Sequence, residues 1–235
     1  MVDFVDGARE ALGLAVVIDV FRAFSVACYA HAQGASRIIP VALIERAREL
    51  RAAIPDSLLI GERHARPLPG FDCGNSPTEL AQLDLQGRTV IHTTHSGTQG
   101  LTQALRADGV ISGSLVNAGA IVNYIRSRGF ERVTLVRMGH EARERCAEDD
   151  LCADILQQRL AGGSPDVTQV RELLRAAESA RKFFDPEATW APEQDFELCT
   201  RVDVFDFVLQ LQVQAPVPYL KAIAVRSADT TESIG

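Results

Sequence analysis

The stretch Leu14–Val20, which reads LAVVIDV, is the clearest indication of the fold. It is short, rich in β-branched residues and not amphipathic, which is typical of a strand buried on both faces of a parallel sheet. The next segment, Arg22–Gln33, has the apolar spacing of a helix and stops at Gly34, a favourable residue after a helix end. A buried strand followed directly by a helix is the repeating unit of an α/β fold.

The same alternation of strand and helix continues along the chain. Further strands are expected at Arg37–Val41, Leu58–Gly61, Arg88–His92, Gly109–Ser112 and Arg132–Arg137. Further helices are expected at Leu43–Ala53, Gly97–Arg106, Ala118–Arg128 and Asp149–Leu160, and a loop is expected at His64–Pro77. Connections this short predict a mostly parallel central sheet with helices on both faces, a three-layer α/β/α architecture.

The pattern changes after residue 163, where the chain becomes richer in helix. Helices are expected at Val167–Phe184 and Pro192–Asp203, and late strands at Val208–Val213 and Ala222–Val225. We therefore expect one α/β domain over residues 1–235, with a helix-rich C-terminal part, residues 164–235, packed on the sheet.

The composition favours a cytoplasmic globular protein and argues against a membrane or nucleic-acid partner. The 235 residues carry 24 Lys and Arg against 31 Asp and Glu, a net charge of −7, so the dominant basic surface that nucleic acid requires is missing. No apolar run reaches the ~18 residues of a membrane helix. Asp19 interrupts the most apolar early stretch, so no signal peptide is expected. The five cysteines include no C-x-x-C pair, which favours reduced thiols.

Charged and small polar residues follow the carboxyl ends of the predicted strands. In chain order they are Asp19, Arg22 and Ser25; Glu62, Arg63, Asp72, Asn75 and Ser76; Thr93, Thr94, Ser96, Gly97 and Thr98; Ser114 and Asn117; Glu148 and Asp149. Ligands of open parallel sheets bind at this edge, where helix N-termini point. Acids, arginines and hydroxyl groups together favour a small, anionic, phosphorylated substrate and a divalent metal ion.

Two of these segments each allow two interpretations. The segment 93–98, TTHSGT, is either a phosphate cradle at a helix N-terminus or an ordinary helix cap. It is not a Walker A loop, which requires a lysine. Residues 148–150 (EDD) are either a solvated helix start or part of a magnesium site.

Asp19 ends a buried strand, where a carboxylate is costly unless it is paired, hydrogen-bonded or metal-bound. It is a metal ligand or a phosphoryl acceptor, or else it forms an ion pair with Arg22. A phosphatase of the haloacid dehalogenase type would carry a second aspartate two residues later, where this chain has Phe21.

Five segments, in order, resemble the motifs of the 2-phosphosulfolactate phosphatase family. The segments are VVIDVFRAFS at 16–25 (family VVIDVLRATT), GER at 61–63 with PGFDCGNSP at 69–77 (family GER and GFDLGNSP), HTTHSGTQGL at 92–101 (family TTTNGTRAL), GSLVNAGAIV at 113–122 (family GSFLNASAV) and EDDLCADIL at 148–156 (family ED-x-LCAG). The resemblance covers roughly residues 14–156.

The resemblance implies an Mg²⁺-dependent phosphatase that hydrolyses (R)-2-phospho-3-sulfolactate to 3-sulfolactate and phosphate, a step of coenzyme M biosynthesis. A homodimer is left open. The mechanistic hypothesis assigns catalysis to Asp19, Arg22 and Arg63, and metal binding to Asp19, Glu62, Asp72, Glu148 and Asp149. It assigns substrate binding to Ser25, Asn75, Ser76, Thr93, Thr94, Ser96, Gly97, Thr98, Ser114 and Asn117. Asp19 either attacks phosphorus or activates water.

Two departures from the family pattern keep alternatives open. His95 and Ser96 stand where Thr and Asn are usual, and Arg137–Ala147 differs from the family's CAGTxGxFSL, with Arg137 in place of Cys. One alternative is a phosphatase acting on a different small phosphate ester. The other is a non-catalytic anion-binding module that has kept the fold and lost the chemistry.

Overall fold

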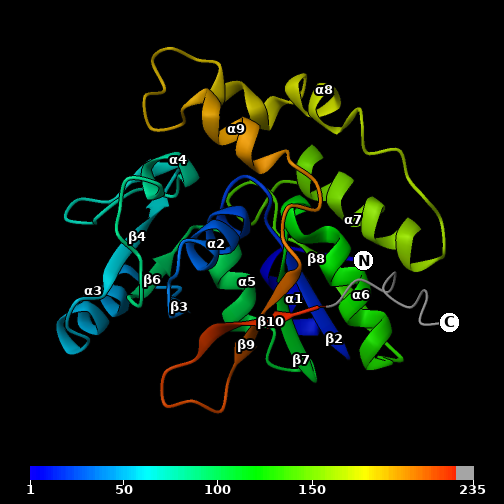
Figure 1. Ribbon diagram of the computed structural model, residues 1–235, viewed down its shortest axis with the longest axis horizontal. Coiled ribbons are helices and arrows are strands. Elements are labelled where there is room, and N and C mark those ends of the chain that lie inside the picture. The colour runs from blue at the N-terminus through cyan, green and yellow to red at the C-terminus, as the bar shows by residue number, and fades with distance from the viewer. Residues whose placement is uncertain (226–235) are drawn as a thin grey trace, which may run out of the picture.

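The computed structural model describes residues 1–225 and contains a ten-stranded sheet in the order β1-β8-β2-β7-β9-β10-β3-β6-β4-β5 (Figure 1). The strands are β1 Val2–Asp3, β2 Leu14–Ile18, β3 Arg37–Pro40, β4 Leu58–Arg63, β5 Arg66–Pro67, β6 Thr89–Thr93, β7 Gly109–Gly113, β8 Val133–Arg137, β9 Phe207–Gln212 and β10 Tyr219–Ala224. The predicted α/β class and mostly parallel sheet are confirmed.

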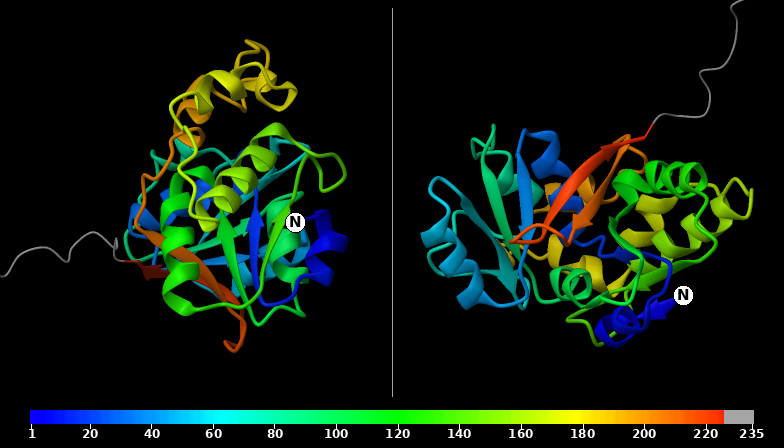
Figure 2. Two further views of the ribbon diagram at one scale, coloured as in Figure 1. Left: turned by 90° about the vertical axis from the view of Figure 1, so that its right-hand side faces the viewer. Right: turned by 90° about the horizontal axis from the view of Figure 1, so that it is seen from below.

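The sheet consists of two parallel groups joined by an antiparallel hairpin. Strands β1, β8, β2 and β7 form one parallel group, and β3, β6 and β4 form the other. Hairpin β9–β10 lies between them, antiparallel to β7 at Ile111↔Gln210 and to β3 at Leu220↔Ile38 (Figure 2, right). The sequence located both strands of this hairpin but not its antiparallel placement in the middle of the sheet.

Most helices lie where the apolar spacing predicted them. Their bounds are α1 Phe4–Glu10, α2 Ala23–Ala32, α3 Ile44–Ala53, α4 Pro77–Leu80, α5 Gly97–Gln103, α6 Ala118–Arg128, α7 Ala147–Leu160, α8 Val170–Arg175 and α9 Glu193–Cys199, with short 3₁₀ turns at Leu115–Asn117 and Glu178–Phe183. The single helix expected at 167–184 is wrong, because Ala177 adopts an extended conformation and separates α8 from the second 3₁₀ turn. The chain before β2 forms β1 and α1, which carried no recognised pattern.

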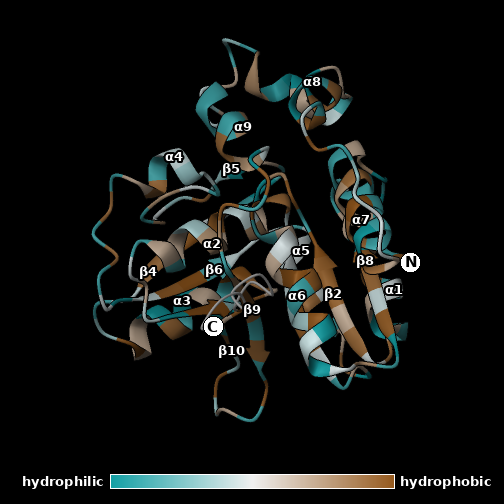
Figure 3. Cartoon of the chain, turned by 45° about the vertical axis from the view of Figure 1, so that its right-hand side comes forward, coloured by the Kyte–Doolittle hydropathy of each residue, from teal (hydrophilic) through white to brown (hydrophobic). Residues whose placement is uncertain are grey.

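The side chains of β2 alternate between two cores, one on each face of the sheet. Ala15 and Val17 belong to the core that includes residues of α2 and α5, whereas Val16 and Ile18 belong to the core that includes residues of α6 and α7. This two-sided burial explains why the strand is almost continuously apolar. In Figure 3 the central strand β2 is largely hydrophobic, while the outlying α8 and α9 carry hydrophilic stretches.

The C-terminal helical segments lie over one end of the sheet (Figure 1). Helix α9 packs against α4 and against the 3₁₀ turn at Glu178–Phe183, which also contacts α7. These contacts bring residues beyond 175 next to the carboxyl ends of the early strands. Among residues 1–225, no helix combines the length and the apolar character that crossing a bilayer would require.

Candidate active site

A cleft with an empty volume of about 550 Å³ opens at the carboxyl ends of β2, β4 and β8. Its lining is rich in charged and histidine side chains. It consists of Asp19, Phe21, Arg22, Glu62, His64, Ala65, Asn75, His95, Ser96, Gly139, His140, Glu141, Cys146, Glu148, Asp149, Ser179 and Lys182. Seven residues that the sequence predicted for the site are among them: Asp19, Arg22, Glu62, Asn75, Ser96, Glu148 and Asp149.

Asp19 lies directly after β2 and is held by backbone N–H groups on both of its oxygens. Oδ1 accepts a hydrogen bond from the Ala23 N–H at 3.2 Å, and Oδ2 accepts one from the Gly97 N–H at 2.9 Å. A Cβ atom at position 97 would lie 2.8 Å from Oδ2, so glycine is needed for this close approach. The first turn of α5 therefore binds the Asp19 carboxylate, and Asp19 forms no ion pair with Arg22 among the described residues.

Two further carboxylates come from the first turn of α7. Asp149 accepts hydrogen bonds from the Val20 N–H and the Gly139 N–H, both at 2.8 Å, and so connects α7 to the ends of β2 and β8. Glu148 accepts a hydrogen bond from the Ser179 hydroxyl at 2.5 Å. Both side chains are only 3% exposed, so this helix start is not the solvated acidic turn of the simpler interpretation. We call Asp19, Glu148 and Asp149 the acidic floor of the cleft.

The carboxyl groups of the acidic floor are buried close enough together to raise one another's pKa. Burial is the largest cause that raises the pKa of Asp19 to about 7, and the charges of Glu62 and Glu148 add to the shift. Burial also raises the pKa of Glu148, and burial together with the Asp19 and Glu148 charges raises the pKa of Asp149 well above its usual range. Buried carboxylates that repel one another are stabilised by a cation placed between them.

Lys182 brings a positive charge to the cleft from the 3₁₀ turn after α8. Its pKa is lowered by burial and by the Arg22 charge, and the negative charge of Glu148 opposes this shift. Within residues 1–225 its Nζ makes neither a hydrogen bond nor an ion pair, although it lies 5.1 Å from the centre of the Phe183 ring. The ammonium group is therefore available to an anion in the cleft.

Arg22 is already engaged by the protein. Its Nη1 donates to Asp195 Oδ2 at 2.9 Å and to the Trp190 carbonyl at 2.7 Å, and its Nη2 donates to the Ala65 carbonyl at 3.0 Å. Asp195, which is fully buried, also accepts a hydrogen bond from the Ser76 hydroxyl at 2.7 Å. Arg22 thus borders the cleft while it connects α9 and the β4–β5 hairpin to the end of β2.

Glu62, near the end of β4, and Asn75, in the loop before α4, also line the cleft. Glu62 accepts hydrogen bonds from the His95 N–H at 2.7 Å and the Ala65 N–H at 2.8 Å. The Asn75 side-chain oxygen lies 3.1 Å from Nε2 of His92. Burial lowers the pKa of His92 to about 3, so this imidazole is neutral.

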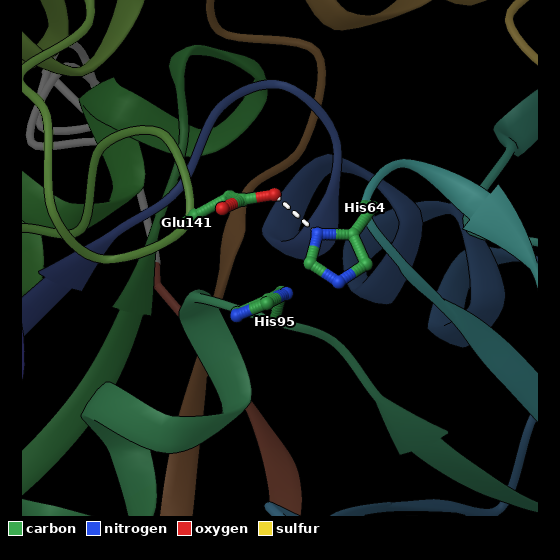
Figure 4. Close-up of side chains that lie close together, drawn as sticks. All are labelled: His64, His95 and Glu141. Carbon is green, nitrogen blue, oxygen red and sulfur yellow. Dashed lines mark hydrogen bonds and ion pairs between the residues drawn. The ribbon is translucent and has the colours of Figure 1, made fainter.

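Three residues at the mouth of the cleft form a cluster that the sequence did not predict. Nδ1 of His64 lies 2.5 Å from Oε1 of Glu141, and the rings of His64 and His95 are 4.8 Å apart (Figure 4). Burial lowers the pKa of His95, and the hydrogen bond with His64 lowers that of Glu141. We call His64, His95 and Glu141 the histidine rim.

Several predicted residues lie outside the cleft because they serve the protein's own hydrogen bonds. Arg63 donates to Thr93 and to the carbonyls of Glu62 and Ala42. Exposed Asp72 pairs with Arg51 at 2.7 Å and accepts from the Leu59 N–H. The remaining residues of this kind are Ser25, Ser76, Thr93, Thr94, Gly97, Thr98, Ser114 and Asn117.

The hydroxyl groups predicted to bind phosphate are bonded to one another or to the backbone. Thr98 Oγ1 accepts from the Thr94 N–H at 2.9 Å. Ser25 Oγ lies 2.6 Å from Ser114 Oγ, and Asn117 accepts from the Ser114 N–H. These groups shape the strand ends and do not face the cleft, whereas Ser96 does.

Comparisons with known proteins identify related sequences. The model of the family described as 2-phosphosulpholactate phosphatase matches residues 4–214. A probable 2-phosphosulfolactate phosphatase of Thermotoga petrophila is 34% identical over 203 residues, which cover 83% of this chain and 87% of the relative. A relative with the same description from Thermoplasma acidophilum is 32% identical, and the match covers 80% of this chain and 81% of the relative. Another from Symbiobacterium thermophilum is 36% identical, and the match covers 66% of this chain and 67% of the relative.

Proposed function

Because the chain belongs to the 2-phosphosulfolactate phosphatase family of phosphoric monoester hydrolases, we propose that it hydrolyses (R)-2-phospho-3-sulfolactate to 3-sulfolactate and phosphate in this cleft. The observation that carries the placement is the convergence of three buried carboxylates and Lys182 on one cavity at the sheet edge. Phosphoryl transfer needs mainly positioning and charge stabilisation, which such a cavity can supply.

The acidic floor fits the Mg²⁺ ion that this family resemblance implies. Carboxylate oxygens are preferred ligands of Mg²⁺. Each Asp19 and Asp149 oxygen accepts one backbone N–H and keeps a second lone pair for a cation. We assign Asp19, Glu148 and Asp149 as the residues that would hold Mg²⁺. When bound, the ion would reduce the electrostatic repulsion between the phosphate oxygens and these carboxylates.

The cationic side chains of the cleft fit a substrate that carries several negative charges. Lys182 binds the phosphoryl or sulfonate group as a point charge, since its ammonium has no ion-pair partner in the described part of the chain. His140 and Ser96 line the same cavity and supply further hydrogen-bond donors. Arg22, whose Nη atoms are bonded to the protein, adds charge and positions Ala65.

Asp19 takes part in the attack on phosphorus in one of two ways. Its carboxylate either bonds to phosphorus and is later released by water, or takes a proton from the water that attacks. In both routes the ester P–O bond breaks and the 2-hydroxy acid leaves. Trapping during single turnover distinguishes them, since only the first route forms an acyl phosphate on Asp19 that borohydride can reduce, whereas solvent oxygen enters the phosphate when water attacks phosphorus in either route.

The altered segment Arg137–Ala147 supports a working site rather than a lost one. Gly139, in this segment, donates its N–H to Asp149, and Arg137 pairs with Asp3 and Asp150 at the base of α7. The departure from the family pattern therefore still positions a carboxylate of the acidic floor.

The test of the proposed function is phosphate release by the purified protein. With Mg²⁺ present it should release phosphate from 2-phospho-3-sulfolactate, and EDTA should stop the reaction until Mg²⁺ is restored. Phospholactate, which lacks the sulfonate, should react with a higher KM. No release from any phosphorylated 2-hydroxy acid would refute the proposed activity, and release from other phosphate esters alone would change only its substrate.

A further inference from the structure

We propose that the histidine rim is a binding site for a divalent transition-metal ion of the Zn²⁺ class, separate from the Mg²⁺ proposed for the acidic floor. One ligand atom from each of His64, His95 and Glu141 lies within 4.8 Å of the other two. Two imidazoles and one carboxylate form a ligand set used by catalytic zinc sites, which keep a further position open. Figure 4 shows the three side chains facing one another.

The three ligands come from segments far apart in the sequence, and each segment is anchored. His64 lies at the tip of the β4–β5 hairpin, where the neighbouring Ala65 bonds through its N–H to Glu62 and through its carbonyl to Arg22. The backbone N–H of His95 is bonded to Glu62 as well. A single buried carboxylate thus fixes the distance between the two histidine segments.

Two tight turns direct the side chains of His64 and Glu141 toward each other. The pairs His64–Ala65 and Glu141–Ala142 all have φ between 50° and 61°, a left-handed conformation that non-glycine residues seldom adopt. Each pair stands at the tip of a short antiparallel turn, one between β4 and β5 and one between His140 and Glu144. Such backbone conformations cluster at functional sites. The two turns thus bring His64 and Glu141, which are far apart in the sequence, within 2.5 Å of each other.

A nitrogen atom of His95 lacks a partner at this place. Nδ1 is buried and makes no hydrogen bond to any residue in 1–225. An imidazole nitrogen without a donor or acceptor partner loses the interaction that water would provide. A metal ion bound at the histidine rim through Nδ1 gives this nitrogen a partner.

The chemistry of the ligands selects the class of metal. Imidazole nitrogen suits Zn²⁺, Co²⁺, Ni²⁺ and Cu²⁺, whereas Mg²⁺ prefers oxygen and keeps its water. The acidic floor offers oxygen only, and the histidine rim offers two nitrogens. All three rim residues line the cleft, so an anionic group of a bound molecule, such as a sulfonate or a carboxylate, can take the open position on the metal.

The site is tested by titrating the metal-free full-length protein with Zn²⁺ and with Co²⁺ in the presence of excess Mg²⁺. We expect one equivalent of each metal to bind tightly, and Co²⁺ to show d–d bands of a site with fewer than six ligands. The variants His64→Asn, His95→Asn and Glu141→Gln should each weaken Zn²⁺ binding more than about 100-fold, since even partners behind the ligands are worth 10- to 100-fold. Asparagine at position 64 tolerates the left-handed backbone.

Matched controls come from groups of the same type outside the cluster. His31→Asn alters a half-buried histidine beside Phe207, and Glu144→Gln alters an exposed acid of the same turn as Glu141. Both should leave Zn²⁺ affinity within about twofold, and circular dichroism should show that every variant is folded.

Two results would overturn the assignment. The first is Zn²⁺ binding that is absent at micromolar concentration or unchanged in all three rim variants. The second is a thiolate-to-cobalt charge-transfer band that Cys146→Ser abolishes, because it would move the site to the cysteine in the cleft. The measurement does not depend on turnover, so it stands apart from the phosphatase test.

Discussion

The acidic floor and the histidine rim border the same cleft but hold their side chains in different ways. Both oxygens of Asp19 and of Asp149 accept backbone N–H groups, and these side chains are buried. His64 and Glu141 are held mainly by each other, on two left-handed turns at the surface. Backbone donors position a charge without further support, whereas contacts between side chains adapt more readily. We therefore expect the acidic floor to govern the rate of the reaction and the histidine rim to govern what binds.

The largest effect is expected from Asp19→Asn. It keeps the shape of the side chain but removes the charge and half of its acceptors, and we expect kcat to fall by about three to four orders of magnitude. Steady-state kinetics would measure the loss.

At the histidine rim, His64→Asn should change KM while kcat stays within about tenfold. A contact that binds the substrate and the transition state equally well does not alter kcat.

Asp72→Asn is the matched control for this substitution. The sequence placed Asp72 among the metal ligands, but in the structure it pairs with Arg51 away from the cleft. Its kcat should stay within about twofold of the wild type. Equal losses at positions 19 and 72 would contradict the cleft described above.

The second effect concerns the ion pair behind the cleft. Asp195→Ala removes the partner of Arg22 in a pair whose side chains are 2% and 0% exposed. Leaving one buried charge without its partner costs about 3–5 kcal/mol of unfolding free energy. Urea denaturation would measure it.

An exposed pair provides the comparison for that loss. Arg46→Ala breaks the surface pair with Glu49 on α3 and should cost less than about 1 kcal/mol. If Asp195→Ala cost no more than Arg46→Ala, Arg22 would be free to move, and its proposed anchoring of the β4–β5 hairpin would fail.

The sequence placed the acids of the cleft better than its other lining residues. Asp19, Glu62, Glu148 and Asp149 line the cleft because a parallel sheet brings the carboxyl ends of its strands to one edge. Ser25, Ser114 and Thr98 follow strands too, but a position at a strand end does not determine the direction of a side chain. In the fold these hydroxyl groups point into the protein.

The lining residues that the sequence did not predict lie on irregular backbone. Lys182 and Ser179 come from a 3₁₀ turn, and His64 and Glu141 from left-handed turns, none of which leaves an apolar period in the sequence. Only two lysines occur in the chain, and the presence of one of them in the cleft depends on how the C-terminal part packs. His95 carried a usable signal, since it departs from the family pattern within a motif.

The third effect tests the cation of the cleft. Lys182→Met keeps most of the apolar stem and removes the charge, and we expect kcat/KM to fall by about 100-fold, in line with the loss of one preorganised electrostatic contact. The other lysine of the chain, Lys221 on β10, is exposed and serves as the control, since Lys221→Met should leave kcat/KM within about twofold. Higher phosphate or sulfolactate inhibition constants for Lys182→Met alone would locate the loss in anion binding.

The smallest effect concerns His92, beneath Asn75. In the folded protein burial lowers its pKa from 6.5 to about 3, so the unfolded chain takes up a proton that the folded chain does not. The stability that neutral His92 provides is complete above the unfolded pKa and is lost as the pH falls toward the folded pKa. Between pH 7 and pH 5 one such group lowers the unfolding free energy by about 2 kcal/mol.

His92→Gln removes this titration, so its unfolding free energy should fall less steeply with acid than that of the wild type, whatever the substitution costs at pH 7. Urea denaturation at several pH values gives both curves. The difference between them should be constant above pH 7, where His92 is neutral in both states, and should shrink by about 2 kcal/mol at pH 5. Parallel curves down to pH 5 would mean that the folded protein protonates His92, and the neutral imidazole beneath the cleft would have to be abandoned.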